Sequence, residues 1–333
     1  MAKLFFLLSG EHETLPISEL KAILEAEGHV FKTLERLDQA LRLEANLNCV
    51  KGIGHRAALT RICALELFSC EAKTNKIVKA MRSASLTDVL KDNESFAVRI
   101  KRVKNYASQI HIMALESKLG KFILNSTYKT RVDLKNPDRT FIGILTEEKL
   151  IFGVKLVEIR PKPFVERRPR KKPFFHPSAM LPKLSRCMVN LTKPKTGDLI
   201  LDPFCGTGSI LIEAALIGCC IVGLDVQRRM VKGSLKNMDY FNIKPEGIIA
   251  ADARNPPIRK VDCVVTDPPY GRSASSLGLP THEVIHRMLK GVEDILSCGS
   301  RVCMAAPKTV GVSSLGEALG FEVEESHLFY VHR

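Results

Sequence analysis

The carboxyl-terminal part of the chain alternates short apolar segments with amphipathic ones. From Thr196 onward the pattern predicts strands over 199–201, 221–224, 248–250, 263–265 and 302–304, with helices over 209–216, 227–239 and 282–296. Strands that are apolar on both faces and alternate with helices are typical of a parallel sheet covered on both sides. We therefore predict a doubly wound, Rossmann-like α/β domain here, and a terminal hairpin over 321–332.

The amino-terminal half has a mixed pattern. Apolar periodicity predicts strands over 4–8 and 96–100, short strands around 132 and over 141–145, and helices over 16–27, 57–67 and 108–119. Such a mixture indicates an α+β region in which helices pack on a sheet.

Between the two halves lies a basic segment interrupted by three prolines. Within 160–172 there are seven Lys and Arg residues and a single acid, Glu166. A solvated hinge and a strip of phosphate contacts are both consistent with this composition. We predict boundaries that give an α+β, ferredoxin-like segment over 1–50, an α+β domain over 51–155, a basic linker over 156–173 and the α/β domain over 174–333.

The charge balance favours a polyanionic partner. The chain of 333 residues carries 50 Lys and Arg against 36 Asp and Glu, a formal net charge of +14. Surplus surface charge that serves only solubility is the alternative.

Cysteine usage and hydropathy bear on the compartment. The ten cysteines have no metal-like spacing, so we expect reduced core cysteines, no metal site and a cytoplasmic protein. The apolar run over 3–8 is short and acidic residues follow it, so we read a buried strand and not a signal peptide. The run over 214–224 is too short for a bilayer, so we expect no membrane association.

The segment 199–209 contains a strand, an acid, a glycine turn and the start of a helix. In a doubly wound fold this arrangement places a ligand at the carboxyl end of the strand. A dinucleotide site would have glycine where Leu211 stands, and Asp202 would repel a pyrophosphate. A carboxylate suits the sulfonium and ammonium cations of S-adenosylmethionine. We therefore assign Asp202, Cys205, Gly206, Thr207 and Gly208 to that cofactor.

Two further acids end the next two predicted strands. Asp225 is placed to accept hydrogen bonds from the ribose hydroxyls, and Asp252 with the Ala253 amide could hold the adenine. A helix cap or a turn former is the alternative for either acid alone. Three acids at three successive strand ends favour the cofactor interpretation.

The candidate catalytic loop is Asp267-Pro268-Pro269-Tyr270-Gly271, which follows the fourth predicted strand. An exocyclic amine on a base is a poor nucleophile because its lone pair is delocalised into the ring. The Asp267 carboxylate and the Pro268 carbonyl could accept its two N–H bonds and localise that pair. Tyr270 could stack on the base. An ordinary proline turn is the alternative, but the acids upstream favour catalysis.

These motifs resemble the amino-group class of S-adenosylmethionine methyltransferases, which carry D/N-P-P-Y and D-P-F-C-G-x-G. The segment 174–186 is similar to the part of that family that covers the methionine end of the cofactor, and this makes His176 and Pro177 cofactor contacts.

The segment 132–138 and the strand after it are similar to THUMP domains, RNA-binding modules of tRNA-modifying enzymes. A THUMP domain followed by Asp-Pro-Pro-Tyr-Gly resembles the archaeal tRNA guanine-N2 methyltransferases that act at position 10. Asp267 favours that group, because related THUMP enzymes more often carry Asn before the prolines.

The resemblance implies that the THUMP domain, within 51–155, binds the acceptor stem of tRNA. The candidate phosphate contacts are Arg99, Lys101, Arg102, Lys104, Lys129, Arg131, Arg167, Arg168, Arg170, Lys171 and Lys172.

Several alternatives stay open at this point. The same loop would serve another THUMP-type RNA guanine-N2 methyltransferase or a DNA adenine-N6 methyltransferase. An RNA-binding scaffold without activity is a different class of function. The number of methyl groups, the tRNA species, the oligomeric state and any accessory subunit are not fixed by the residues.

Overall fold

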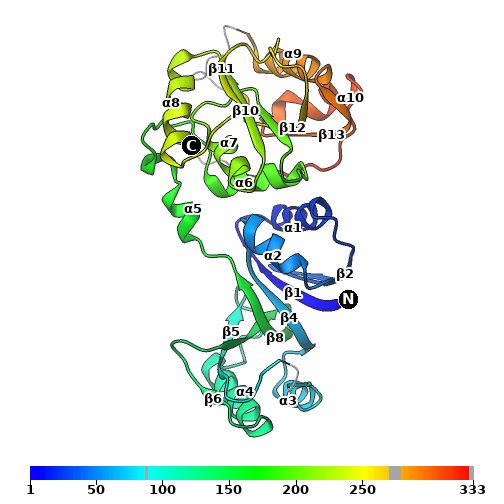
Figure 1. The fold of residues 1–333 in the computed structure, drawn as a ribbon. Coiled ribbons are helices and arrows are strands. Elements are labelled where there is room, and N and C mark those ends of the chain that lie inside the picture. The colour runs from blue at the N-terminus through cyan, green and yellow to red at the C-terminus, as the bar shows by residue number, and fades with distance from the viewer. Residues whose placement is uncertain (87–88, 270–278, 330–333) are drawn as a thin grey trace. The chain divides into compact units, whose positions relative to one another are not determined.

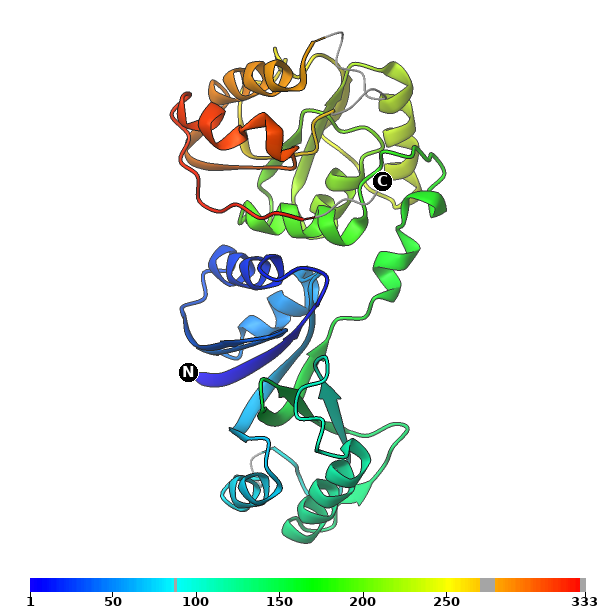
Figure 2. The ribbon, with the colours of Figure 1, turned by 180° about the vertical axis from the view of Figure 1, so that it is seen from behind.

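The computed structural model describes residues 1–86, 89–269 and 279–329. The chain divides into two compact units (Figures 1 and 2). Unit 1 comprises Met1–Ile17, Gly28–Gly54 and Leu59–Ile159, and unit 2 comprises Ser18–Glu27, His55–Ala58 and Arg160–Arg333. The domain boundaries that we expected from the sequence stay a prediction.

Unit 1 is built on an eight-stranded sheet with the order β2-β3-β1-β4-β8-β7-β5-β6. Its strands are β1 (Ala2–Leu8), β2 (Phe31–Leu37), β3 (Ala40–Ala45), β4 (Thr60–Glu71), β5 (Ser95–Arg102), β6 (Arg131–Val132), β7 (Arg139–Thr146) and β8 (Lys149–Glu158). The helices of this half of the chain are α1 (Leu15–Ala26), α2 (Cys49–Arg56), α3 (Thr74–Arg82) and α4 (Ile112–Ser126). The predicted α+β class is confirmed.

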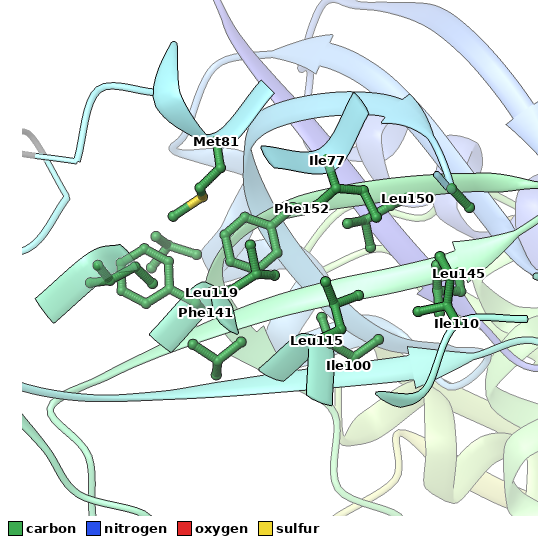
Figure 3. Packing of buried hydrophobic residues seen from close by; sticks show 14 of the residues in the cluster. Ile77, Met81, Ile100, Ile110, Leu115, Leu119, Phe141, Leu145, Leu150 and Phe152 are labelled. Carbon is green, nitrogen blue, oxygen red and sulfur yellow. The ribbon is translucent and has the colours of Figure 1, made fainter. Parts of the chain in front are cut away.

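One core of unit 1 lies where α3 and α4 cover the sheet (Figure 3). Leu115 and Leu119 are four residues apart, so they lie on one face of α4 and point to the same layer. Phe141 and Phe152 are stacked at 6.0 Å between ring centroids. These side chains are almost completely buried, which makes this layer a main source of the unit's stability.

The predicted helix over 57–67 is wrong, because β4 occupies that segment. β4 pairs antiparallel with β1 on one side and with β8 on the other. Ile62, Cys63 and Ala64 are consecutive and all buried, which fits a central strand covered on both faces. A short apolar run of this kind does not distinguish helix from strand by periodicity.

Unit 2 contains a five-stranded sheet with the order β11-β10-β9-β12-β13, in which every neighbouring pair is parallel. The strands are β9 (Leu199–Asp202), β10 (Cys220–Asp225), β11 (Gly247–Ala250), β12 (Val261–Thr266) and β13 (Leu296–Met304). The helices are α5 (Lys162–Glu166), α6 (Pro182–Leu191), α7 (Ser209–Ala215), α8 (Arg228–Tyr240), α9 (Thr281–Glu293) and α10 (Val312–Glu317). The doubly wound, Rossmann-like prediction is confirmed.

The predicted hairpin at the end of the chain does not form within residues 321–329, which the structure describes and which contain no strand. Glu324 instead makes ion pairs with Lys193 and with Arg301, the latter at 2.8 Å. Charged contacts from side chains take the place of a backbone ladder in this segment.

A buried polar network joins the early segments of unit 2 to α6. The Asn190 amide donates to the Glu19 carboxylate at 2.9 Å and to the Arg56 carbonyl at 3.0 Å. The Arg56 guanidinium donates to Asn190 and, at 2.9 Å, to the Pro194 carbonyl. Because buried polar groups are costly when unpaired, Ser18–Glu27 and His55–Ala58 are needed to complete unit 2.

Within the described residues, no helix combines the length and the apolar character that crossing a bilayer requires.

Gly153 on β8 is a site where the sheet tolerates no side chain. A Cβ at this position would lie 1.8 Å from the backbone oxygen of Leu65 on β4. We expect Gly153→Ala to lower the free energy of unfolding by about 1–3 kcal/mol, as overpacking does. The matched control is Gly120→Ala in α4, where the nearest atom would be 3.9 Å away. That change should stabilise by about 0.5–1 kcal/mol. Urea unfolding that ranks the two variants in the reverse order would contradict this packing.

Candidate functional site

The strand order of unit 2 brings together the loops that carry the predicted site. β9 lies between β10 and β12, and the chain runs from β9 toward β11 on one side and from β12 toward β13 on the other. Ligands of doubly wound folds bind at the carboxyl edge where the strand order reverses. The loops after Asp202 and Thr266 meet at this reversal.

The loop between β9 and α7 is a tight, glycine-dependent turn. Gly206 and Gly208 have φ values of 51° and 77°, a region that favours glycine. The Cys205 N–H donates to the Leu224 carbonyl at 2.8 Å, and the Gly208 N–H donates to the Cys205 carbonyl at 2.7 Å. A Cβ on Gly208 would lie 2.4 Å from the Ser234 Oγ. The glycine conformations and these hydrogen bonds therefore fix the backbone conformation of the loop that carries the predicted cofactor residues.

Asp202 is buried at the base of this loop. Its Oδ1 accepts hydrogen bonds from the Thr266 hydroxyl at 2.7 Å and from the Phe204 N–H at 3.1 Å. Burial raises the pKa of Asp202 to about 7, because removal from water disfavours the charged form. No ion pair to Asp202 is present among the described residues, so this carboxylate suits a cationic ligand.

Asp225 ends β10 and supports the same loop. Its Oδ2 accepts from the Gly206 N–H at 3.1 Å, and its Oδ1 accepts from the Gln227 N–H at 2.8 Å. Burial raises the pKa of Asp225, and nearby His176 favours the charged form. The His176 Nδ1 lies 2.7 Å from the Ser178 Oγ. The assignment of His176 to the cofactor stays a prediction. The structure places Pro177 beside it on an exposed stretch.

Asp252 follows β11 and is paired with an arginine that the sequence analysis did not single out. The Arg254 Nε lies 2.9 Å from both carboxylate oxygens of Asp252. This hydrogen bonding lowers the pKa of Asp252. Ala253 beside it is buried. A role for Asp252 in binding adenine would have to accommodate Arg254, a constraint that its position after a strand did not reveal.

Asp267 follows β12 and contains a buried, unpaired oxygen. Its Oδ1 has no hydrogen-bond partner among the described residues. Burial raises the pKa of Asp267 to about 6. Pro268 is buried beside it, and its carbonyl accepts no hydrogen bond from a described backbone donor. Tyr270 and Gly271 lie outside the described residues. Two acceptors thus stand without described donors next to the β9 loop.

Two of the predicted phosphate contacts in the basic segment, the partly buried Arg167 and the buried Lys172, have partners on α7. Arg167 forms a two-pronged ion pair with Glu213 of α7, at 2.6 and 3.1 Å. The Lys172 Nζ donates to the Ser209 Oγ at 2.7 Å, and burial lowers the pKa of Lys172 to about 8. Both side chains are thus engaged with α7, and their assignment to tRNA phosphates stays a prediction.

The other basic candidates differ in exposure and in partners. The exposed residues are Lys101, Lys129, Arg131, Arg168, Arg170 and Lys171. Protein partners are present for four candidates: Arg99 donates to the Leu134 carbonyl, Arg102 to the Ala107 and Ile110 carbonyls, Arg131 to the Asn93 carbonyl at 3.0 Å, and Lys104, which is also exposed, pairs with Asp38 at 2.6 Å. Exposed side chains are accessible to a phosphate, and their assignment stays a prediction.

Residues that hold the site together include two that the sequence pattern does not reveal. Thr266 bonds to Asp202, and the Asn237 amide donates to the Thr207 carbonyl at 3.0 Å. Asn237 is completely buried. A buried amide on the inner face of an amphipathic helix was the available signal, since such groups need partners.

Comparison with known proteins identifies two domains. The family profile of the RMKL-like methyltransferase domain matches residues 169–333, and that of the THUMP domain matches residues 71–154. Among solved structures, TrmN from Thermus thermophilus is 19% identical with a TM-score of 0.54, covering 95% of this chain and 91% of that one. A predicted N6-adenine-specific DNA methylase from Listeria monocytogenes is 12% identical with a TM-score of 0.55 and the same coverages. Likenesses this remote show the fold alone.

Curated relatives are closer in sequence and match over nearly their full length. The tRNA (guanine(10)-N2)-dimethyltransferase of Methanothermobacter thermautotrophicus is 35% identical, covering 99% of this chain and 96% of its own. The enzyme of the same name from Methanocaldococcus jannaschii is 31% identical, covering 98% and 96%. The chain therefore belongs to the family of the archaeal tRNA (guanine(10)-N2)-dimethyltransferases.

Proposed function

We infer that this protein transfers methyl groups from S-adenosylmethionine to the exocyclic N2 amine of guanine 10 in tRNA. The observation that carries the inference is the buried, unpaired Oδ1 of Asp267, held next to the β9 loop through the Thr266–Asp202 hydrogen bond. The names of the full-length relatives support the substrate and the atom. We propose that the enzyme acts in the cytoplasm on tRNA.

The residues at the carboxyl edge fit a cationic cofactor. Asp202 and Asp225 are anionic groups whose pKa values burial raises, so a nearby positive charge would stabilise their ionised forms. When bound, S-adenosylmethionine supplies an electrophilic methyl group on a positively charged sulfur. Asp202 and the loop over Cys205–Gly208 would hold the methionine end, and Asp225 would hold the ribose. His176 and Pro177 would cover the loop.

The Asp267 carboxylate and the Pro268 carbonyl would orient the amine. Each would accept one N–H of the guanine amine, so that the nitrogen lone pair faces the methyl group. Proline fixes its own φ near −65°, which keeps the carbonyl acceptor in place. After transfer, Asp267 can take the released proton. Tyr270 would stack on the extruded base.

The names of the relatives include dimethylation, and we propose two successive transfers for this chain as well. The first product still carries one N–H. Two acceptors serve the first transfer, and one acceptor is enough to orient the remaining N–H in the second. The exposed basic side chains Lys101, Lys129, Arg131, Arg168, Arg170 and Lys171 would contact tRNA phosphates.

Methylation of defined transcripts tests this function directly. We expect nucleosides from tRNA incubated with enzyme and S-adenosylmethionine to contain N2-methylguanosine and N2,N2-dimethylguanosine by mass spectrometry. A transcript with adenine at position 10 should accept no methyl group. Duplex DNA is the second acceptor, because a DNA adenine-N6 methyltransferase could use the same loop. Methyladenine in that DNA, with unmodified tRNA, would refute the proposal. No binding of cofactor in calorimetry would instead indicate an RNA-binding scaffold.

Substitution of Asp267 tests its two proposed roles, which are to accept an N–H of the amine and to take the released proton. We expect Asp267→Ala to reduce kcat at least about 100-fold, the scale of losing one oriented polar group in a preorganised site. Asp267→Asn keeps one acceptor oxygen and should retain more activity than Asp267→Ala. Affinity for tRNA should stay within about twofold in both, as measured by fluorescence anisotropy. Glu317→Gln, which alters an exposed acid of α10, is the control. Full methylation by Asp267→Ala would eliminate the assigned mechanism.

The pH dependence of transfer should report the same carboxyl group. The folded pKa of Asp267 is about 6, raised from 3.8, and its ionised form is the acceptor. With S-adenosylmethionine at saturation, so that Asp202 is already occupied, we therefore expect kcat/KM for tRNA to fall as pH drops through about 6. Asp267→Asn should lack this part of the profile. Burial also means that the folded state binds the Asp267 proton more tightly than the unfolded state does. The free energy of unfolding therefore falls as pH rises from about 4 to about 6. Asp267→Asn should therefore raise Tm at pH 8 and leave it unchanged below pH 4.

A further inference from the structure

Helix α8 (Arg228–Tyr240) carries four basic side chains on an exposed surface of unit 2. They are Arg228, Arg229, Lys232 and Lys236, and we call them the basic face of α8. Residues 228, 232 and 236 are spaced by four, so they lie in a row along the helix. None of the four makes an ion pair or side-chain hydrogen bond with a residue that the structure describes. Their charges are not neutralised by those neighbours.

The basic face borders a shallow hollow of about 450 Å³, which Phe174 and Gly233 also line. A Cβ on Gly233 would lie 2.1 Å from the Phe174 ring, so the ring rests directly on the helix backbone. The Arg229 guanidinium lies 5.9 Å from the centre of that ring. Phe174 thus forms a wall beside the cations and helps to fix the position of Arg229.

The hollow is connected to the cofactor loop by hydrogen bonds. The Phe174 N–H donates to the Asn237 side chain at 2.8 Å, and the Asn237 amide donates back to the Phe174 carbonyl at 2.9 Å. The same amide donates to the Thr207 carbonyl in the β9 loop. In addition, α8 begins only three residues after Asp225. The basic face therefore lies on a helix that is bonded to the predicted cofactor loop through Asn237.

We propose that the basic face of α8 binds backbone phosphates of the tRNA near the target nucleotide. The proposal rests on the proposed function, and it adds a third phosphate-binding surface to the two proposed for the THUMP domain and the basic segment. The row from Arg228 to Lys236 is about 12 Å long, which suits successive phosphates of an extended strand better than one small anion. Arginine and lysine are the side chains that neutralise the negative phosphates of a nucleic-acid backbone.

The test compares binding of a tRNA transcript at several salt concentrations. We expect the variant Arg228→Ala/Lys232→Ala/Lys236→Ala to raise Kd about tenfold at 0.1 M KCl. The slope of log K against log salt should fall in magnitude by about 2, because each of the three lost contacts with an extended strand removes about 0.7. Affinity for S-adenosylmethionine, measured by calorimetry, should not change. Lys232→Arg/Lys236→Arg keeps both charges and should bind like the wild type.

The matched control is Lys260→Ala/Lys290→Ala/Lys308→Ala, which removes the same charge from exposed positions on other elements of unit 2. It should change Kd less than about threefold and leave the slope within about 0.5 of the wild type. Equal effects of the two triple variants would show that only net charge matters and would overturn the proposal.

Two other outcomes are decisive. A basic-face variant that binds tRNA with unchanged Kd, but no longer binds vesicles of anionic lipid that the wild type binds, would assign the surface to membranes. Wild-type protein that binds tRNA without methylating it would refute the proposed function. The effect of the basic face would still be measurable in that case, because its readout is binding.

Discussion

The hydrogen bond from the Thr266 hydroxyl to Asp202 is the interaction on which the geometry of the site depends. It joins the ends of β9 and β12 at 2.7 Å, inside the unit and away from solvent. The parallel pairing of β9 and β12 brings the loops after these strands together. The hydrogen bond then fixes the orientation of Asp202 toward Thr266, the residue before Asp267. Any cofactor bound over the β9 loop is thereby held next to the Asp-Pro-Pro segment.

The same arrangement is costly to folding. Asp202 and Asp267 are buried carboxyl groups at neighbouring strand ends, and burial raises the pKa values of both, to about 7 and about 6. A protein selected for stability alone would put apolar side chains there. Buried acids at these two positions are explained if the proposed substrates bring a cation to Asp202 and an amine donor to the Asp267 Oδ1. The instability is thus located where the proposed chemistry needs it.

The sequence predicted the parallel sheet well because its strands contain short apolar runs, and an acid ends or closely follows β9, β10, β11 and β12. It failed where local pattern does not determine the outcome. The run over 60–64 became β4 because β1 and β8 pair with it, an event of tertiary structure. The site acids were found from their positions at strand ends. Arg254, Thr266 and Asn237 were not, since partners brought together by folding have no spacing signature in a single chain.

The net charge of +14 illustrates the same limit in another way. Within the segment rich in Lys and Arg, Arg167 and Lys172 turn inward and hold α7 through Glu213 and Ser209. Meanwhile the scattered cations of α8 gather into one face only when the helix forms. A charge that is clustered in sequence can therefore be structural, and one that is dispersed can form a surface. The Asn237 amide bonds to both Phe174, which lines the hollow beside the basic face, and Thr207 in the β9 loop. A phosphate bound at the basic face would therefore lie next to the contacts that hold the predicted cofactor loop in place.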